Sequence, residues 1–247
     1  MTTEAAAQAP VVQVARVVRN YQGLRPLRIA SLSIARGERV ALSGIDAGAA
    51  EVLINLVTGA ALPDEGDVRV LGRSTAEISD GDQWLAFLEQ FGIVSPRAIL
   101  MEGASIQQNL AMPFTLRIDP VPPDIAARVQ ALAAECGIGS GTAGPGVTER
   151  LGTLAGEAPQ DIRARLHFAR AIALDPALVL LEHPTAGVED AARLALGDDM
   201  ARVLESRGLT ALVITQDEPF ARRVAHRTLK LQPATGELKP QRRGWFK

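Results

Sequence analysis

Hydrophobic and polar positions along this chain change repeatedly between a period of two residues and a period of about 3.6, which predicts strands separated by helices. Strand-type segments, rich in Val, Ile and Leu, lie at residues 11–18, 27–35, 40–42, 68–71, 92–94, 178–181, 211–214 and 228–231. Helix-type segments lie at residues 50–58, 80–91, 106–110, 159–173, 191–207 and 218–226, with a further helix capped by Asp124. Strands that alternate with helices predict a parallel sheet of the α/β class.

One long segment departs from this alternation. Between residues of about 97 and 160 the pattern is helical only, so we expect a helical subdomain inserted into a single domain that spans residues 1–247, with 1–10 as a flexible tail. Glycines in the run 136–146 resemble part of a dinucleotide-binding fingerprint, but that fingerprint needs a strand before it and a helix after it. The run follows a helix, and we expect a loop there.

Composition narrows the class of protein. With 47% hydrophobic and 22% charged residues the chain is typical of globular proteins. Its net charge of −2 argues against binding nucleic acid by neutralising phosphates, and its single cysteine, Cys136, excludes an internal disulfide. Its apolar runs are too short for a membrane span, and its first residues lack a secretory signal, so we expect a cytoplasmic protein.

Residues 39–60 carry the strongest chemical signal. An apolar strand enters a turn at Gly44 and continues into a helix, which is typical of a phosphate-binding loop whose backbone N–H groups surround the phosphates. Such a loop also needs a second glycine, a Lys and a Ser or Thr hydroxyl for Mg²⁺. This chain has Ala49, Ala50 and Glu51 at those three positions. The scaffold is therefore present without its usual side chains.

Four further stretches resemble the ATP-binding cassette subunits of ABC transporters, and with the loop they cover nearly the whole chain. They are ARAIALDPALVLLEHPTAGVED (169–190), ALPDEGDVRVLGR (61–73), NLAMP (109–113) and VITQDEPFARRVAHR (213–227). The resemblance implies a RecA-like P-loop core with an antiparallel β subdomain and an inserted α-helical subdomain. It also implies a subunit that docks on a membrane permease and meets a second cassette.

The resemblance assigns the nucleotide-binding positions to Tyr21, Gly44, Asp46, Gly48, Ala49, Ala50, Glu51 and Pro96. It assigns the catalytic positions to Glu182, His183 and Gln216, and the signature and D-loop positions to Gln160, Asp161 and Glu189. Glu182 stands for the metal-binding Asp, His183 for the general-base Glu and Gln216 for the switch His. Pro96 replaces the Gln that links nucleotide to permease. Outside the loop only Tyr21 matches, at the position where the family stacks an aromatic ring on adenine. Simple packing is the open alternative for this ring.

Two carboxylates decide what we expect of nucleotide binding. Asp46 and Glu51 lie where a triphosphate would bind, and the loop has no Lys to balance them. Like charges about 4 Å apart cost roughly 4 kcal/mol at an effective dielectric constant near 20, which corresponds to orders of magnitude in affinity. We therefore expect no cofactor and no metal. A purely structural interpretation is that both carboxylates cap the helix in place of phosphate.

Two functions remain open at this point. The first is a degenerate cassette, peripheral at the inner face of the membrane, that docks on a permease and acts structurally or in regulation. The second is a divergent but active ATPase that uses ATP and Mg²⁺, with His183 as its base. The acid at Glu51 and the missing Lys at Ala50 favour the first. Either would work as a homodimer or as a heterodimer with a second cassette, and neither binds nucleic acid.

Two surfaces carry predictions about partners. We expect a permease to dock in the groove between the core and the helical insert, near residues 96–112, because the apolar run 99–101 lies there in a predicted loop. The alternative is that this run packs inside the insert. The family's head-to-tail dimer face would bring Glu51 of one chain to Arg163 of its partner. The alternative is that Arg163 and Arg165 are solvated or pair with Glu157 and Asp161 of their own chain.

Overall fold

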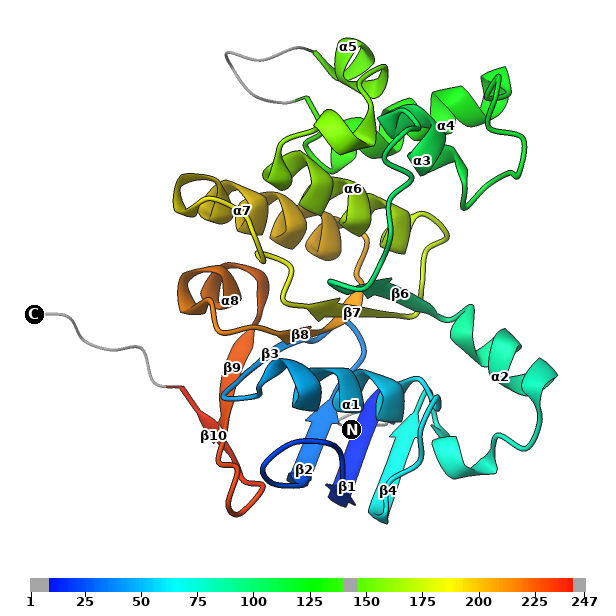
Figure 1. The fold of residues 1–247 in the computed structure, drawn as a ribbon. Coiled ribbons are helices and arrows are strands. Elements are labelled where there is room, and N and C mark those ends of the chain that lie inside the picture. The colour runs from blue at the N-terminus through cyan, green and yellow to red at the C-terminus, as the bar shows by residue number, and fades with distance from the viewer. Residues whose placement is uncertain (1–8, 140–145, 242–247) are drawn as a thin grey trace, which may run out of the picture.

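Two sheets organise the computed structural model, which describes residues 9–139 and 146–241 (Figure 1). The smaller sheet has the order β2-β1-β4-β5 and consists of β1 (Val12–Arg19), β2 (Leu27–Ile34), β4 (Glu65–Val70) and β5 (Arg73–Ser74). The larger sheet has the order β10-β9-β3-β8-β7-β6 and consists of β3 (Arg39–Ser43), β6 (Phe91–Val94), β7 (Leu178–Glu182), β8 (Thr210–Ile214), β9 (Arg227–Leu231) and β10 (Leu238–Pro240).

The pairing directions differ between the two sheets. Every pair in the smaller sheet is antiparallel. The larger sheet is parallel from β9 to β6, and only the edge strand β10 runs antiparallel to its neighbour. The predicted α/β fold with an antiparallel β subdomain is therefore confirmed.

The central strand β7 shows why its sequence is continuously apolar. All five of its residues are buried. Leu178 and Leu180 face one hydrophobic cluster, which includes α1 and the smaller sheet, whereas Val179 and Leu181 face a second cluster, which includes α6 and α7. A parallel strand covered on both sides has no solvent-facing side and therefore no polar alternation.

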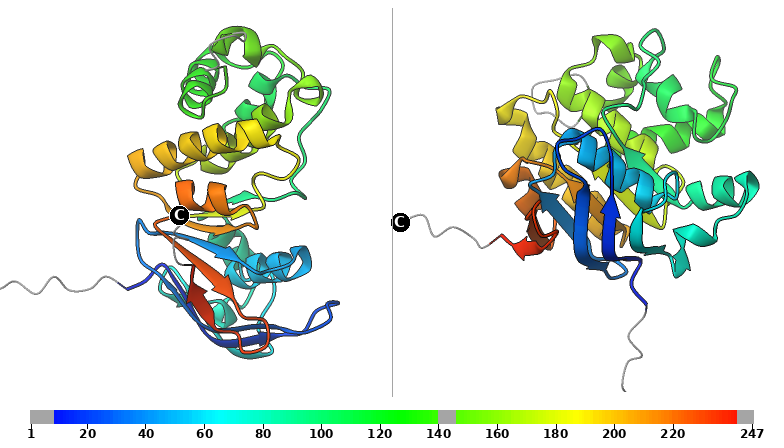
Figure 2. Two further views of the ribbon diagram at one scale, coloured as in Figure 1. Left: turned by 90° about the vertical axis from the view of Figure 1, so that its left-hand side faces the viewer. Right: turned by 60° about the horizontal axis from the view of Figure 1, so that its bottom comes forward.

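Helices cover both faces of the larger sheet (Figures 1 and 2). On one face α1 (Ala47–Val57) packs between the two sheets, with α2 (Gly81–Leu88) at its side. On the other face lie α6 (Gln160–Ile172), α7 (Asp190–Ser206) and α8 (Glu218–Val224). The smaller sheet, with the 3₁₀ turn η1 (Thr75–Glu77) after it, lies at one end of the molecule.

A group of helices forms the opposite end of the molecule, beyond α6 and α7 (Figure 2). It contains α3 (Ile106–Ala111), α4 (Pro123–Glu135), α5 (Val147–Leu151) and the 3₁₀ turn η2 (Ala155–Glu157). Their buried side chains belong to the same cluster as those of α6 and α7, so this group packs firmly on the rest. Within residues 9–139 and 146–241, no helix has both the length and the apolar character needed to cross a membrane.

Some local predictions were wrong. Asp124 lies in the first turn of α4, and the N-cap residue is Pro122. The helix predicted over 80–91 ends at Leu88, because Phe91 already pairs with Leu178 in the sheet. Strands β5 and β10 were not predicted, since two or three residues show no period. The predicted tail 1–10 and the predicted loop 136–146 lie partly outside the described residues.

Candidate functional site

The turn from β3 into α1 is built around a glycine and an aspartate. Gly44 has a φ of 74°, and a Cβ on it would lie 2.9 Å from the carbonyl oxygen of Leu231, so this position requires glycine. Asp46 is the N-cap residue of α1, and its Oδ1 accepts a hydrogen bond from the backbone N–H of Ala49 at 2.8 Å. Free N–H groups and the helix dipole attract anions at a helix N-terminus. In this chain its own carboxylate occupies that place.

The ring of Tyr21 lies against this turn. Its hydroxyl donates to Oδ2 of Asp46 at 3.2 Å, and a Cβ on Gly48 would lie 3.1 Å from ring carbon Cε2. Burial and the neighbouring carboxylate raise the pKa of Tyr21 above its usual value, because both favour the protonated phenol. A hollow of about 370 Å³ beside the ring is lined by residues of the β1–β2 connection and of the turn.

Gln216 ties the turn to the segment that follows β8. Its side-chain Nε2 donates to the carbonyl oxygen of Ile45 at 2.7 Å, and its Oε1 accepts from the backbone N–H of Gly44 at 3.4 Å. A single amide group thus binds both a donor and an acceptor of the turn. The predicted catalytic position 216 and the predicted phosphate-binding position 44 are therefore in direct contact.

Ala49 and Ala50 point into the core and leave the turn without a long side chain at these positions. Ala49 is 5% exposed and Ala50 is fully buried. Gly48, one residue earlier, is exposed. The expectation that both acids would cap the helix holds for Asp46 and is wrong for Glu51, which lies in the second turn of α1 and faces a different partner.

That partner is Arg97, which no sequence pattern predicted. Its Nη1 and Nη2 donate to Oε1 and Oε2 of Glu182 at 3.1 and 2.7 Å, and its Nη1 lies 3.4 Å from Oε2 of Glu51. The side chain of Glu182 is 1% exposed, whereas those of Arg97 and Glu51 are 47% and 46% exposed. We call these contacts the Arg97 bridge. A buried carboxylate at the end of an apolar strand needs a cation, and that requirement was the available signal.

His183 follows Glu182 in an unusual backbone conformation. Its φ is 45°, in the left-handed region that non-glycine residues rarely adopt, and its backbone N–H donates to the carbonyl oxygen of Ile214 at 2.8 Å. Its Nε2 is buried and has no hydrogen-bond partner among the described residues. His183, Pro96 and Gln160 line a common hollow of about 260 Å³. The structure therefore brings these three predicted positions together.

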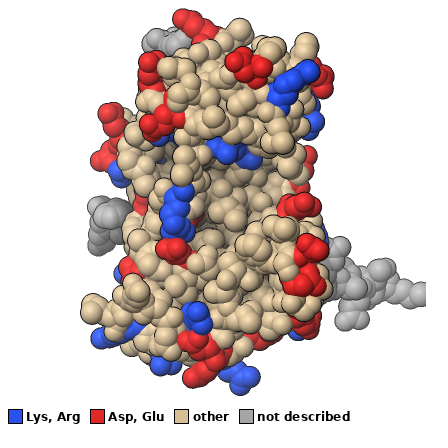
Figure 3. Space-filling model, turned by 45° about the vertical axis from the view of Figure 1, so that its right-hand side comes forward, with Lys and Arg blue, Asp and Glu red and all other residues tan. Residues whose placement is uncertain are grey.

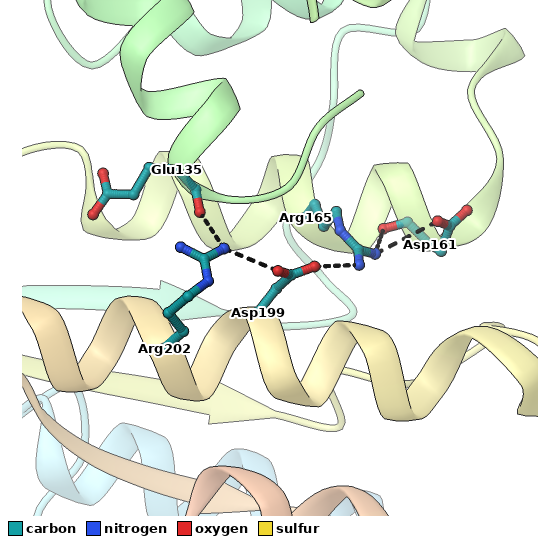
Figure 4. A network of polar contacts seen from close by, with 5 residues as sticks. All are labelled: Glu135, Asp161, Arg165, Asp199 and Arg202. Atoms are coloured by element: carbon teal, nitrogen blue, oxygen red, sulfur yellow. Dashed lines mark hydrogen bonds and ion pairs between the residues drawn. The ribbon is translucent and has the colours of Figure 1, made fainter. Parts of the chain in front are cut away.

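The start of α6 is held by an ion network (Figure 4). Asp161 lies 3.5 Å from Nη1 of Arg165, whose side chain is only 7% exposed. Nη2 of Arg165 donates to Asp199 on α7 at 2.7 Å. Arg202 donates both to Asp199 and to the carbonyl oxygen of Glu135, each at 2.9 Å. The network joins α6, α7 and the end of α4.

The other predicted positions on this face lie apart from that network. Arg163 pairs with Glu102 at 3.1 Å and donates to the carbonyl oxygen of Ala155 at 3.0 Å. Both arginines therefore pair within the chain, as the alternative predicted, although Arg163 does so with Glu102 and not with Glu157. Glu189 is exposed at the N-cap position of α7. Across the described ranges, no group of three or more His, Cys, Asp or Glu side chains is arranged to hold a metal ion.

The sequence is similar to those of proteins from ABC transporters. A profile described as ABC transporter matches residues 27–186. The lipoprotein-releasing system ATP-binding protein LolD of Alcanivorax borkumensis is 28% identical over 224 residues, which cover 87% of this chain and 91% of LolD. The phosphonates import ATP-binding protein PhnC of Anaeromyxobacter dehalogenans is 31% identical over 82% of this chain, and the methionine import ATP-binding protein MetN of Brucella abortus is 26% identical over 92%. The chain spans 40% of the length of PhnC and 58% of that of MetN.

Comparison with solved structures gives the same fold. A bacterial ABC transporter cassette whose dimeric structure is known matches with a TM-score of 0.71 at 18% identity, over 95% of this chain and 100% of that one. The cbiO1 protein of Clostridium perfringens, part of the ABC transporter complex cbiONQ, matches with a TM-score of 0.74 at 19% identity, over 94% of this chain and 87% of that one. At these identities the likeness concerns the fold.

Proposed function

This chain belongs to the ABC transporter family, and we propose that it is a cassette subunit that docks on a membrane permease and acts structurally or in regulation, with weak or no ATP binding. Its place would be peripheral, at the inner face of the membrane, paired with a copy of itself or with a second, intact cassette. Relatives named as ATP-binding proteins of lipoprotein release and of methionine import support the transport setting.

The observation that carries the proposal is the Asp46 carboxylate at the N-terminus of α1. It accepts the Ala49 N–H at 2.8 Å and receives the Tyr21 hydroxyl at 3.2 Å. A phosphate group bound there would meet a negative charge about 4 Å away, which costs roughly 4 kcal/mol at an effective dielectric constant near 20. That energy alone corresponds to about a thousandfold loss of affinity.

The residues present do not fit Mg²⁺ and a triphosphate. The loop position that carries Lys in a phosphate-binding loop is the fully buried Ala50, and the hydroxyl position is Glu51. Glu182, at the metal-binding position, is already paired in bidentate fashion with Arg97. An anion of the protein, Asp46, thus lies where phosphate would bind, and a cation of the protein, Arg97, lies beside the metal-binding position.

Docking on a permease is supported by the surface between the sheet and the helical end. Figure 3 shows a hollow on this face that is lined mainly by uncharged side chains. A hollow of about 700 Å³ lies between β6 and the end of α6. Ala98 lines this hollow, and in the run that follows it Ile99 is 82% exposed and Met101 is 51% exposed, whereas Leu100 is buried. Leu100 therefore packs inside, as the alternative predicted, and the exposed Ile99 and Met101 are the residues that we propose contact the permease.

Calorimetric titration with Mg-ATP up to millimolar concentration tests the proposal. We expect no binding heat from the wild type, and a micromolar dissociation constant would contradict the proposal and favour the active ATPase with His183 as base. If weak binding occurs, Tyr21→Ala should abolish it, because stacking would be the main remaining contact.

Two further measurements complete the test. Phosphate release by the protein reconstituted with its permease should stay at the level of a His183→Ala control, because losing one part of a catalytic unit commonly costs about a hundredfold or more. A crosslinker at residue 99 should reach a membrane subunit, and the same crosslinker placed on α7 at exposed Leu194 is the matched control. Equal crosslinking from both positions would refute this docking face.

A further inference from the structure

The Arg97 bridge joins three elements that are far apart in the sequence. Arg97 lies in the connection between β6 and α3, Glu182 ends β7 and Glu51 lies on α1. The guanidinium contacts both Glu182 oxygens, at 3.1 and 2.7 Å, and one Glu51 oxygen at 3.4 Å. A planar guanidinium matches a carboxylate in this bidentate way better than an ammonium group does.

The three side chains of the Arg97 bridge differ in burial, so its contact with Glu182 is stronger than its contact with Glu51. Glu182 is 1% exposed, so its charge depends on a cation at contact distance. Arg97 and Glu51 are each nearly half exposed, so their mutual contact lies close to water. Glu182 therefore fixes the guanidinium, and Glu51 adds a weaker contact to the turn region.

The rest of the β6–α3 connection is held by the helical end. Asn109, which is fully buried on α3, accepts from the Met101 N–H and donates to the Met101 carbonyl oxygen, each at 3.0 Å. Nη1 of Arg170 on α6 donates to the carbonyl oxygen of Ile99 at 2.9 Å. The first part of the connection is held instead by a local turn and by the Arg97 bridge. In the turn the Ala98 N–H donates to the Ser95 carbonyl oxygen at 2.9 Å, and the Arg97 N–H donates to the Ser95 hydroxyl oxygen at 3.2 Å.

We propose that Arg97 is a positioning residue that fixes residues 95–98 on the core through Glu182 and Glu51, so that the chain leading into the run 99–101 is held in place without nucleotide or metal. The inference rests on the proposed function, since residues 95–98 lead directly into the run 99–101, the proposed permease contact. It goes further by naming the side chain that takes over the cation's role in this site. Because the charges of the Arg97 bridge belong to the protein itself, the position of residues 95–98 does not depend on ATP.

Amide hydrogen exchange of the nucleotide-free protein, followed by NMR, tests this inference. In Arg97→Ala we expect the amides of residues 97 and 98 to exchange about tenfold faster or more, because the local turn alone should not hold them. The Met101 amide, which Asn109 binds, should change by less than about twofold. Adding Mg-ATP to the wild type should leave all three amides unchanged.

Matched variants keep the result interpretable. Because Arg97→Ala leaves Glu182 buried without its cation, we pair it with the double variant Arg97→Met and Glu182→Gln, which removes the contact and the charge together. Both should expose residues 97 and 98, while Arg97→Lys should restore part of the protection and Arg222→Ala, an exposed arginine of similar exposure, should change nothing.

Two outcomes would overturn the inference. The first is wild-type protection of residues 97 and 98 in the double variant, and the second is an equal loss at Met101, which would mean general loosening. Neither depends on ATP binding. Tight binding of Mg-ATP in calorimetry would contradict the proposed function alone, so the two failures can be told apart.

Discussion

Replacing Asp199 with alanine should lower the free energy of unfolding by about 3 kcal/mol, because it leaves a buried guanidinium without its nearest partner. The Arg165 side chain is 7% exposed and lies 2.7 Å from Asp199 but 3.5 Å from Asp161. Removing one member of a buried ion pair costs about 3–5 kcal/mol, since the other charge remains in a site with little water. The remaining contact with Asp161 places the expectation at the lower end of that range.

The reciprocal variant should cost less. In Arg165→Met the remaining carboxylate of Asp199 is 24% exposed and keeps Arg202 at 2.9 Å, so its charge is still solvated and paired. We expect about 1–3 kcal/mol for that change, as for loss of a hydrogen bond to a charged group. The order of the two losses is therefore a direct consequence of burial.

Urea unfolding followed by circular dichroism measures both losses. The control is Arg222→Ala, which removes an exposed pair with Glu218 and should cost about 0–1 kcal/mol. The slope of the unfolding free energy against urea concentration should stay constant across the series, which would show that the variants do not change the unfolded state. A loss for Asp199→Ala no larger than that for Arg222→Ala, or smaller than that for Arg165→Met, would refute the role assigned to the burial of Arg165.

Three further predictions concern single positions. Tyr21 is the only tyrosine, so an absorbance titration should place its pKa above 10.0 and show a lower pKa in Asp46→Asn. Because the folded state holds this proton more tightly, the contribution of Tyr21 to stability should decline as pH rises through the raised pKa. A urea midpoint that stays constant over that pH range would contradict this. Gly92→Ala should lower the free energy of unfolding in urea by about 1–3 kcal/mol or more, because its Cβ would lie 2.2 Å from a backbone oxygen of α6. The control Gly81→Ala, whose Cβ would have no described atom within 4 Å, should be neutral, and equal losses in the two variants would contradict the prediction. Leu100→Ala should cost about 2–5 kcal/mol, because this side chain is 3% exposed, and a loss below about 1 kcal/mol would place it outside the core.

The fold was largely predictable because its signals are local. Segment 178–181 is continuously apolar since β7 is covered on both faces, and the helix after Gly44 could be placed from its period and its turn. Boundaries were less accurate where two elements share apolar residues. Phe91 continues the helical period of α2 but pairs with Leu178, and only the position of β7 decides between the two.

The candidate site was predictable only in part, for a related reason. The residues of the turn are neighbours in sequence, so Gly44, Asp46 and Glu51 could be found together. Arg97 and Glu182 are separated by 85 positions, and an arginine after a proline has no pattern of its own. Contacts of this kind depend on which strand ends are neighbours in the sheet, and that order could not be inferred from this sequence alone.

The place of β3 in the sheet has a consequence for biosynthesis. Its two neighbours are β8 and β9, which come late in the sequence, so β3 leaves the ribosome long before either partner exists. Until then its N–H and C=O groups are unpaired on both edges, and long-range pairing of this kind forms slowly because a large loop must close first. The turn around Asp46 can therefore take its final geometry only after almost all of the chain has been translated, and a nascent chain held on the ribosome would expose β3 to chaperones and proteases.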